Sequence, residues 1–219
     1  MVFKQRILLD RRHVPHGLKA DSALNNPSRQ ITMSLLRKLF ERQKIRSATI
    51  TLIGPPKAGK TTFVRYIETG KPVLEDISTT LGIEIRRNKV EIDGWRLSAI
   101  DTGGQQLYQQ TFWELAVQQA NAVIFVIDST VREETNPELY SLTREQFSYA
   151  LDIIPESIPL LILLNKQDLK EMNPMSPQEA FEIFRNLPLH NRTLAYIPCS
   201  AKYGDGVEDA LRWLVEKLQ

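Results

Sequence analysis

The feature that most constrains this chain is a glycine-rich segment between an apolar run and a helical pattern. Gly54-Pro-Pro-Lys-Ala-Gly59-Lys60-Thr61 fits the pattern G-x-x-x-x-G-K-[ST]. It follows the apolar run Ala48–Gly54 and precedes a helical pattern over residues 60–69. A loop in this position turns backbone N–H groups and a helix N-terminus toward phosphate oxygens. The segment therefore predicts a phosphate-binding loop in which Lys60 reaches the terminal phosphates and the Thr61 hydroxyl ligates Mg²⁺.

The rest of the chain predicts an α/β domain built around this loop. Ala122–Ile127 and Leu160–Leu164 are short, nearly unbroken apolar runs, as expected of strands buried on both faces. Ile83–Ile92 and Trp95–Ile100 meet at Asp93-Gly94, a strong hairpin signal. Further helical patterns cover about 136–152, 177–187 and 206–218. We expect a six-stranded, mostly parallel sheet with one antiparallel strand and helices on both faces.

Length and composition favour one domain with an appendage. The chain has 219 residues, of which 42% are hydrophobic and 25% charged, as in an ordinary soluble domain. No run approaches the roughly 18 apolar residues of a membrane span. The single cysteine, Cys199, has no partner for an internal disulfide, which fits a reducing compartment. The sequence therefore favours a cytoplasmic location.

Charge divides the chain into a basic head, residues 1–46, and an acidic body, residues 47–219. The head has eleven Lys/Arg against three Asp/Glu, a net charge of +8, and the body has a net charge of −6. A pattern typical of an amphipathic helix covers about residues 28–45, with an apolar stripe made by Ile31, Leu35, Leu36, Leu39 and Phe40. Two readings stay open: the stripe binds a membrane surface reversibly, or it packs on its own domain. An RNA-binding arm is less favoured, because Phe3 and Phe40 are the only aromatic residues in the head, and we expect no nucleic-acid partner.

A second motif, Asp101-Thr-Gly-Gly104-Gln105, follows the second strand of the predicted hairpin. A carboxylate at the carboxyl end of a strand is well placed to hold Mg²⁺, usually through water. Gly104 allows a backbone N–H to approach a γ-phosphate, and the Gln105 side chain can orient an attacking water molecule. Downstream of a phosphate-binding loop, this motif indicates nucleotide hydrolysis.

A third motif, Asn165-Lys166-Gln167-Asp168, ends the strand Leu160–Leu164. The carboxylate of Asp168 can accept hydrogen bonds from guanine N1–H and N2–H₂, which adenine does not offer, and such polar mismatches discriminate strongly. Lys166 can lie along the base, and Asn165 can tie this segment to the phosphate loop. Two weaker segments complete the site: Cys199-Ser-Ala-Lys202, in which the Ala201 N–H could meet guanine O6, and Thr80, which could close over Mg²⁺ and the γ-phosphate.

In this order the motifs resemble those of the small GTPases, and specifically the Arf/Sar branch, over about residues 47–219. Gly-Gly-Gln after Asp101, the segment Asn165–Leu169, and Gly204-Asp-Gly206 leading toward Trp213 carry the resemblance to that branch. It implies a small G domain that binds GTP or GDP with Mg²⁺ and hydrolyses GTP slowly as a switch. The implied nucleotide-binding residues are Lys57, Ala58, Gly59, Lys60, Thr61, Thr62, Thr80, Gly104, Asn165, Lys166, Asp168, Ser200, Ala201 and Lys202. The implied catalytic residues are Gln105, Lys60 and Thr80, and the implied metal ligands are Thr61, Thr80 and Asp101.

The resemblance also implies partners and a cycle. Members of the branch work with nucleotide exchange factors, GTPase-activating proteins and effectors, and couple their nucleotide state to membrane trafficking. Their N-terminal helix docks on the domain with GDP and engages lipid with GTP. For this chain we therefore expect peripheral membrane attachment through residues 28–45 in the GTP state.

The sequence departs from the branch at several positions. Ile83, Ile100 and Leu115 stand where the branch usually has aromatic residues, and Pro56 stands where a residue borders Gln105 and the γ-phosphate. Proline has no N–H to donate and a fixed φ. With these differences, the chain resembles a divergent Arf-like protein from outside the well-studied eukaryotic groups.

Two other functions remain to be distinguished. One is a pseudo-GTPase scaffold that binds nucleotide without turnover, which Pro56 leaves open although Gln105 and Thr80 argue against it. The other is a P-loop kinase or ATPase, which Asp168 disfavours.

Overall fold

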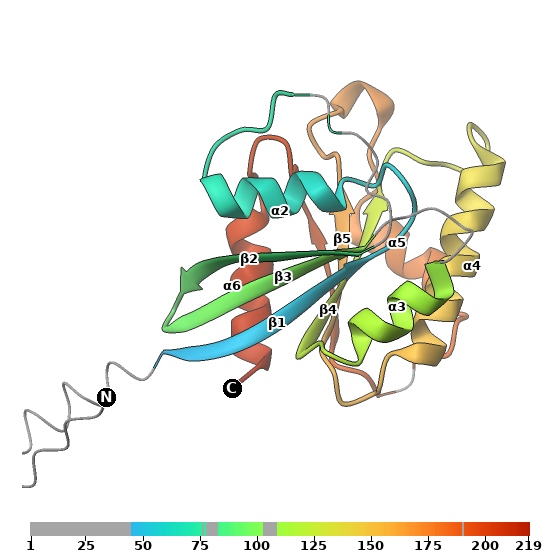
Figure 1. The fold of residues 1–219 in the computed structure, drawn as a ribbon. Coiled ribbons are helices and arrows are strands. Elements are labelled where there is room, and N and C mark those ends of the chain that lie inside the picture. The colour runs from blue at the N-terminus through green and yellow to red at the C-terminus, as the bar shows by residue number, and fades with distance from the viewer. Residues whose placement is uncertain (1–44, 76, 78–82, 103–108, 190) are drawn as a thin grey trace, which may run out of the picture. The chain divides into compact units, whose positions relative to one another are not determined.

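The structure is a computed structural model that describes residues 45–75, 77, 83–102, 109–189 and 191–219 (Figure 1). Residues 45–219 form one compact unit. The predicted helix at about 28–45, and the predicted site residues Thr80, Gly104 and Gln105, lie outside the described residues.

Among the described residues, six strands form one mixed sheet, as predicted, and their order in the sheet is β2-β3-β1-β4-β5-β6. Their bounds are β1 (Arg46–Ile53), β2 (Ile83–Ile92), β3 (Trp95–Thr102), β4 (Ala122–Asp128), β5 (Leu160–Asn165) and β6 (Leu194–Pro198). Every neighbouring pair is parallel except β2 and β3. Because parallel strands end at the same edge of a sheet, the segments after β1, β3, β4 and β5 meet at one edge.

The β2–β3 hairpin turns at Asp93 and Gly94, whose φ angles are 47° and 78°. Two successive residues with positive φ are what a two-residue turn of type I′ requires, which is why Asp-Gly is a strong signal there. The pairing shifts register between Arg86 and Val90, where three residues of β2 (87–89) lie opposite a single residue of β3 (98). The bulge explains why β2 has ten residues and β3 only eight.

Five helices and one short 3₁₀ turn complete the part of the domain that the structure describes. They are α2 (Lys60–Thr69), α3 (Gln109–Val117), α4 (Pro137–Ile153), the 3₁₀ turn η1 (Lys170–Met172), α5 (Pro177–Phe184) and α6 (Val207–Lys217). The sequence patterns predicted all of these helices except α3. Helix α5 ends at Phe184, before the predicted 187. The prediction was too long because the half-buried Leu187 continues the apolar period into a turn beyond the last helical residue.

Helices α2 and α6 cover one face of the sheet, and α3, α4 and α5 cover the other (Figure 1). Alternate residues of β4 enter the two cores: Ile124 and Val126 face α2 and α6, whereas Val123, Phe125 and Ile127 face α3, α4 and α5. This explains why the strand has an unbroken apolar sequence.

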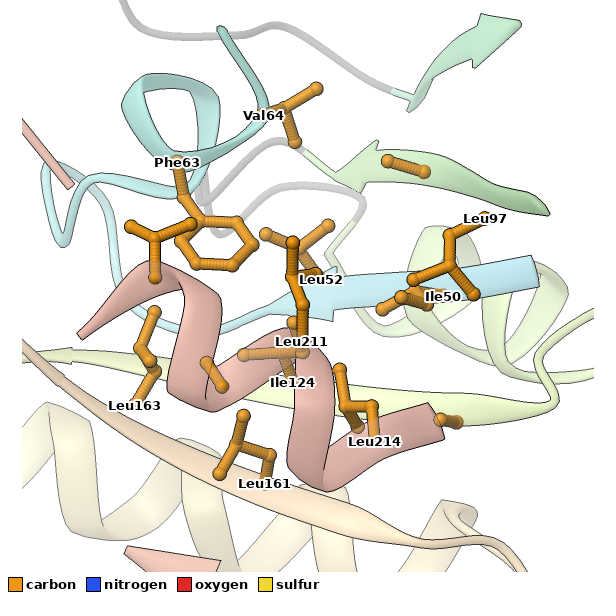
Figure 2. Packing of buried hydrophobic residues seen from close by; sticks show 14 of the residues in the cluster. Ile50, Leu52, Phe63, Val64, Leu97, Ile124, Leu161, Leu163, Leu211 and Leu214 are labelled. Carbon is orange, nitrogen blue, oxygen red and sulfur yellow. The ribbon is translucent and has the colours of Figure 1, made fainter. Parts of the chain in front are cut away.

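Figure 2 shows how side chains from four strands and two helices meet in the first of these cores. Phe63 of α2 and Leu214 of α6 are fully buried against the sheet. Burying such a side chain contributes about 1.5–3 kcal/mol. The core therefore fixes where α2 begins, and with it the end of the glycine-rich loop.

Among the described residues, none of the helices is long and apolar enough to cross a membrane.

Candidate functional site

A cavity of about 420 Å³ lies at the carboxyl end of the sheet. Its size falls within the usual range for small-molecule sites. It lies where the strand order reverses, beside β1 and the strands that flank it, as expected for ligand sites in open α/β sheets. The described residues that line it come from four segments, 56–62, 73–77, 165–169 and 202, together with Thr102. These segments are far apart in the sequence and contain most of the predicted site residues.

The loop after β1 curls through a run of left-handed residues. Gly54, Lys57 and Gly59 have φ angles of 133°, 60° and 99°. A side chain at position 54 would overlap the Val126 carbonyl, and one at position 59 would overlap the Asn165 side chain. Both glycines are therefore required by close packing as well as by conformation. Such a loop presents backbone N–H groups toward its concave side.

The N-terminus of α2 is suited to an anion. No side chain caps it, and no acidic residue lies in its first turn. The first N–H groups of a helix have no partner within the helix and carry partial positive charge. Lys60, Thr61 and Thr62 form this first turn, and all three line the cavity.

Lys60 is nearly buried in the loop. Its Nζ donates to the carbonyl oxygens of Gly54 at 2.8 Å and Pro55 at 2.9 Å, which fixes the ammonium at the cavity. Burial lowers the pKa of Lys60 to about 8, and the nearby Asp101 carboxylate raises it in part. A bound anion would favour the charged form further.

Thr61 and Asp101 are the two described residues of the three predicted to hold a metal ion. The Thr61 hydroxyl donates to Asp101 Oδ2 at 2.6 Å, and the Asp101 side chain is fully buried. Mg²⁺ keeps several waters and usually takes only one or two protein oxygens together with substrate phosphates. A hydroxyl and a carboxylate at the phosphate end of the cavity fit that requirement.

The segment after β5 is tied to the phosphate loop, as predicted. Asn165 Nδ2 donates to the carbonyl oxygen of Ala58 at 2.7 Å, and Asn165 Oδ1 accepts from the Ala201 N–H at 2.8 Å. The Ser200 hydroxyl donates to Asp168 Oδ1 at 2.7 Å. Asn165 thus connects three loops, and the role of the Ala201 N–H toward a base stays a prediction.

The last loop also contacts helix α2. Lys202 lines the cavity, and its carbonyl oxygen accepts from the Val73 N–H at 2.8 Å. Gly204, with a φ of 98°, packs so closely on the Tyr66 ring that a side chain there would overlap it. The loop after β6 is therefore held against the helix that begins at the phosphate end of the cavity.

Sequence reasoning missed two residues beside the site, Asp128 and Gln167. Asp128 ends β4 and pairs with Lys166, with Nζ 2.6 Å from Oδ2. Gln167 Nε2 donates to Ser129 Oγ at 3.1 Å and to the carbonyl oxygen of Met175 at 2.9 Å. For Asp128 the sequence did contain a signal, a carboxylate at the carboxyl end of an apolar strand, which is the signal that identified Asp101.

Of the four positions that depart from the resemblance, all but Ile83 have described side chains. Ile100 is buried, whereas Leu115 on α3 is 47% exposed. Pro56 lines the cavity.

Comparison with known proteins agrees with this arrangement. The model of the ADP-ribosylation factor family matches residues 32–218. The chain is similar to ADP-ribosylation factor-like protein 3 of Saccharomyces cerevisiae, with 29% identity over 178 residues, which are 78% of this chain and 85% of the relative. Because the family model spans most of the chain, the protein belongs to the ADP-ribosylation factor family of small GTPases.

Proposed function

We propose that this protein binds GTP and GDP with Mg²⁺ in the cavity at the end of β1 and hydrolyses GTP slowly as a switch. The observation that carries the proposal is the convergence of the loop at 56–62 and the segment at 165–169 on one cavity of about 420 Å³. The first segment carries groups that bind anions, and the second carries the carboxylate of Asp168.

The choice of guanine rests on Asp168. Its side chain lines the cavity, and one of its oxygens already accepts from Ser200. A carboxylate held in this way still has acceptor capacity for the two N–H donors of guanine. Adenine would leave that capacity unused, and unmatched polar groups in a binding site are costly.

Hydrolysis requires positioned charge at the terminal phosphate. The Lys60 ammonium supplies a fixed positive charge, and its nearly buried position strengthens its attraction for phosphate oxygens. Bound Mg²⁺ would neutralise charge on the phosphates, held through Thr61 and Asp101. We expect Gln105 to orient the attacking water and Thr80 to close over the site, although both lie outside the described residues. No arginine occurs in residues 54–61, so we expect a GTPase-activating protein to complete the site.

Pro56 favours a second candidate function, a pseudo-GTPase scaffold that binds nucleotide without turnover. It lines the cavity and has no N–H to donate. Single-turnover hydrolysis of radiolabelled GTP by the full-length protein separates the two functions. A slow rate abolished by Gln105→Leu is expected of the switch, and no hydrolysis at all is expected of the scaffold.

The nucleotide itself is identified by mass spectrometry of small molecules released from the purified protein by acid. We expect GDP or GTP. Release of adenine nucleotides alone would overturn the proposal. Competition of labelled GDP with GTP and ATP gives a second test, in which GTP should compete and ATP should not.

As a switch, the protein would work with exchange factors, activating proteins and effectors. We propose that its nucleotide state governs peripheral membrane attachment from the cytoplasm, through residues 28–45, and effector recruitment in trafficking. Membership of the ADP-ribosylation factor family and the +8 charge of residues 1–46 support this proposal.

A further inference from the structure

Asp128, the last residue of β4, has both carboxylate oxygens engaged. Oδ2 accepts from Lys166 Nζ at 2.6 Å, while Oδ1 accepts from the Thr130 N–H at 3.1 Å and the Thr130 hydroxyl at 2.7 Å. The Asp128 side chain is 16% exposed and that of Lys166 is 31% exposed. A half-buried carboxylate with two sets of donors has little freedom to move. It is therefore a fixed anchor for the lysine.

Lys166 needs such an anchor. It is the first residue after β5, it lines the cavity, and its φ is 67°. A non-glycine residue in the left-handed region costs about 1–3 kcal/mol and persists only where its surroundings hold it. The long side chain would otherwise carry its ammonium out into water. The bond to Asp128 instead turns the lysine head toward the end of β4.

The turn that carries Asp128 is itself fixed to the segment that carries Lys166. The Ser129 N–H donates to the carbonyl oxygen of Asn165 at 3.0 Å, and Ser129 Oγ accepts from Gln167 Nε2 at 3.1 Å. The main chain after β4 and the main chain after β5 are therefore held in a fixed position relative to each other. The distance between the carboxylate and the lysine is set by the backbone as well as by charge.

We propose that Asp128 is a positioning residue for the base end of the cavity. It holds the Lys166 side chain along the place where a guanine base would lie, beside Asp168. Asp128 is not among the residues that line the cavity, so it acts through Lys166. This inference rests on the proposed function, and it assigns to the nucleotide site a residue from β4, outside the three motifs.

A double-mutant cycle in the full-length chain tests the inference. Asp128→Asn keeps the shape and the acceptor for Thr130 but turns an N–H₂ donor toward the ammonium, which breaks the anchor. Lys166→Met removes the ammonium and keeps the stem. We expect Asp128→Asn to raise the dissociation constant for fluorescently labelled GDP by about tenfold, as for loss of a well-oriented charged hydrogen bond. The double variant should bind no more weakly than Lys166→Met alone, because coupled residues are not additive.

Two controls separate positioning from a structural role. Thr130→Val removes one of the two donors to Asp128 Oδ1 but leaves the Thr130 N–H and the pair with Lys166, so the loss of GDP affinity should be much smaller than that caused by Asp128→Asn. Asp152→Asn, on the exposed end of α4, makes the same chemical change away from the site and should leave GDP affinity unchanged. Thermal melting of each nucleotide-free variant shows whether the fold is kept.

Independent effects of Asp128→Asn and Lys166→Met, or unchanged GDP binding by Asp128→Asn, would overturn the inference. Equal losses in Thr130→Val and Asp128→Asn would overturn it too, because a cap of the turn would then explain both. No binding of GDP by the unsubstituted chain would overturn the proposed function, and the inference with it.

Discussion

Four of the described non-glycine residues have left-handed backbone, and two of them lie beside the cavity, whereas Asp93 and Asn173 lie in turns elsewhere. Lys57 and Lys166 both line it and have φ angles of 60° and 67°. Asp93, in the hairpin turn, has a local reason for the same conformation. Strain of this kind persists at ligand sites because the surrounding contacts determine the backbone. At Lys57 the strained backbone shapes the phosphate loop, so a substitution that relieves the strain should show how much stability the strain costs.

Lys57→Gly is expected to raise the free energy of unfolding of the nucleotide-free protein. Relief of the left-handed conformation gains about 1–2 kcal/mol, and the added freedom of glycine in the unfolded chain costs about 0.5–1 kcal/mol. The net gain should be about 0.5–1 kcal/mol, measured by urea unfolding. Lys71→Gly, at a position without positive φ, is the matched control and should lower stability. A loss of stability in Lys57→Gly would contradict the account of loop strain.

Asp168→Asn tests the base end of the cavity. The asparagine would turn an N–H₂ group toward a guanine donor, so we expect GDP affinity to fall by at least about tenfold. Xanthosine diphosphate has a carbonyl oxygen at the corresponding position and should become the better ligand. Both dissociation constants are measured by isothermal titration calorimetry. Unchanged preference for GDP would remove Asp168 from the site.

At the scale of elements, the predictions succeeded where one local signal determined the structure. The strands β4 and β5 are buried on both faces, and their unbroken apolar runs predicted them. Helix α3 has no such signal, because Gln109–Val117 lacks charged residues except Glu114 and follows directly from a motif loop. Helix α5 ends at Phe184, and apolar periodicity overestimated its length because the half-buried Leu187 continues the period up to Pro188.

The same division holds for the site. Asn165 and Asp101 were predicted because motifs name them, and the structure brings both to the cavity end of the sheet. Asp128 was missed because its role depends on the pairing of β4 with β5, which brings Asp128 opposite Asn165. The bulge between Arg86 and Val90 also depends on strand pairing, which no local pattern specifies.

The packing of the β6–α6 loop on α2 gives a prediction at this scale. Gly204→Ala should lower the free energy of unfolding by about 1–3 kcal/mol, because the new methyl group overlaps the outer end of the Tyr66 ring, which must then move from its packed position. Gly70→Ala is the control, since Gly70 also has positive φ but open space around it, and it should cost only about 1 kcal/mol. Urea unfolding measures both. If the two variants lose equal stability, overlap with Tyr66 is not the cause.

For the whole molecule, the distribution of charge separates residues 1–46 from the rest. The first carry a net charge of +8, and residues 47–219 carry −6. Basic residues near an anionic lipid surface contribute roughly 1 kcal/mol each. The apolar stripe predicted at 31–40 would add burial in the lipid interface. Neither term depends on nucleotide by itself, so a switch requires that the two nucleotide states expose the stripe differently.

We therefore expect nucleotide-dependent sedimentation with vesicles that contain phosphatidylserine. The full-length protein with a non-hydrolysable GTP analogue should sediment more than the GDP form. We expect GTP to draw Thr80 and Gly104 toward the γ-phosphate and to shift the adjoining β2–β3 hairpin, and this shift would release the apolar stripe. A nucleotide drives such a change only through unequal affinity for the two states.

A chain lacking residues 1–46 should stay in solution in both states. Leu35→Ser with Leu39→Ser keeps the basic charge and should also abolish sedimentation, which separates the apolar stripe from simple charge attraction. Equal sedimentation with GDP and the GTP analogue would make residues 1–46 a constitutive anchor. Absence of sedimentation in either state would favour the other reading, in which the stripe packs on its own domain.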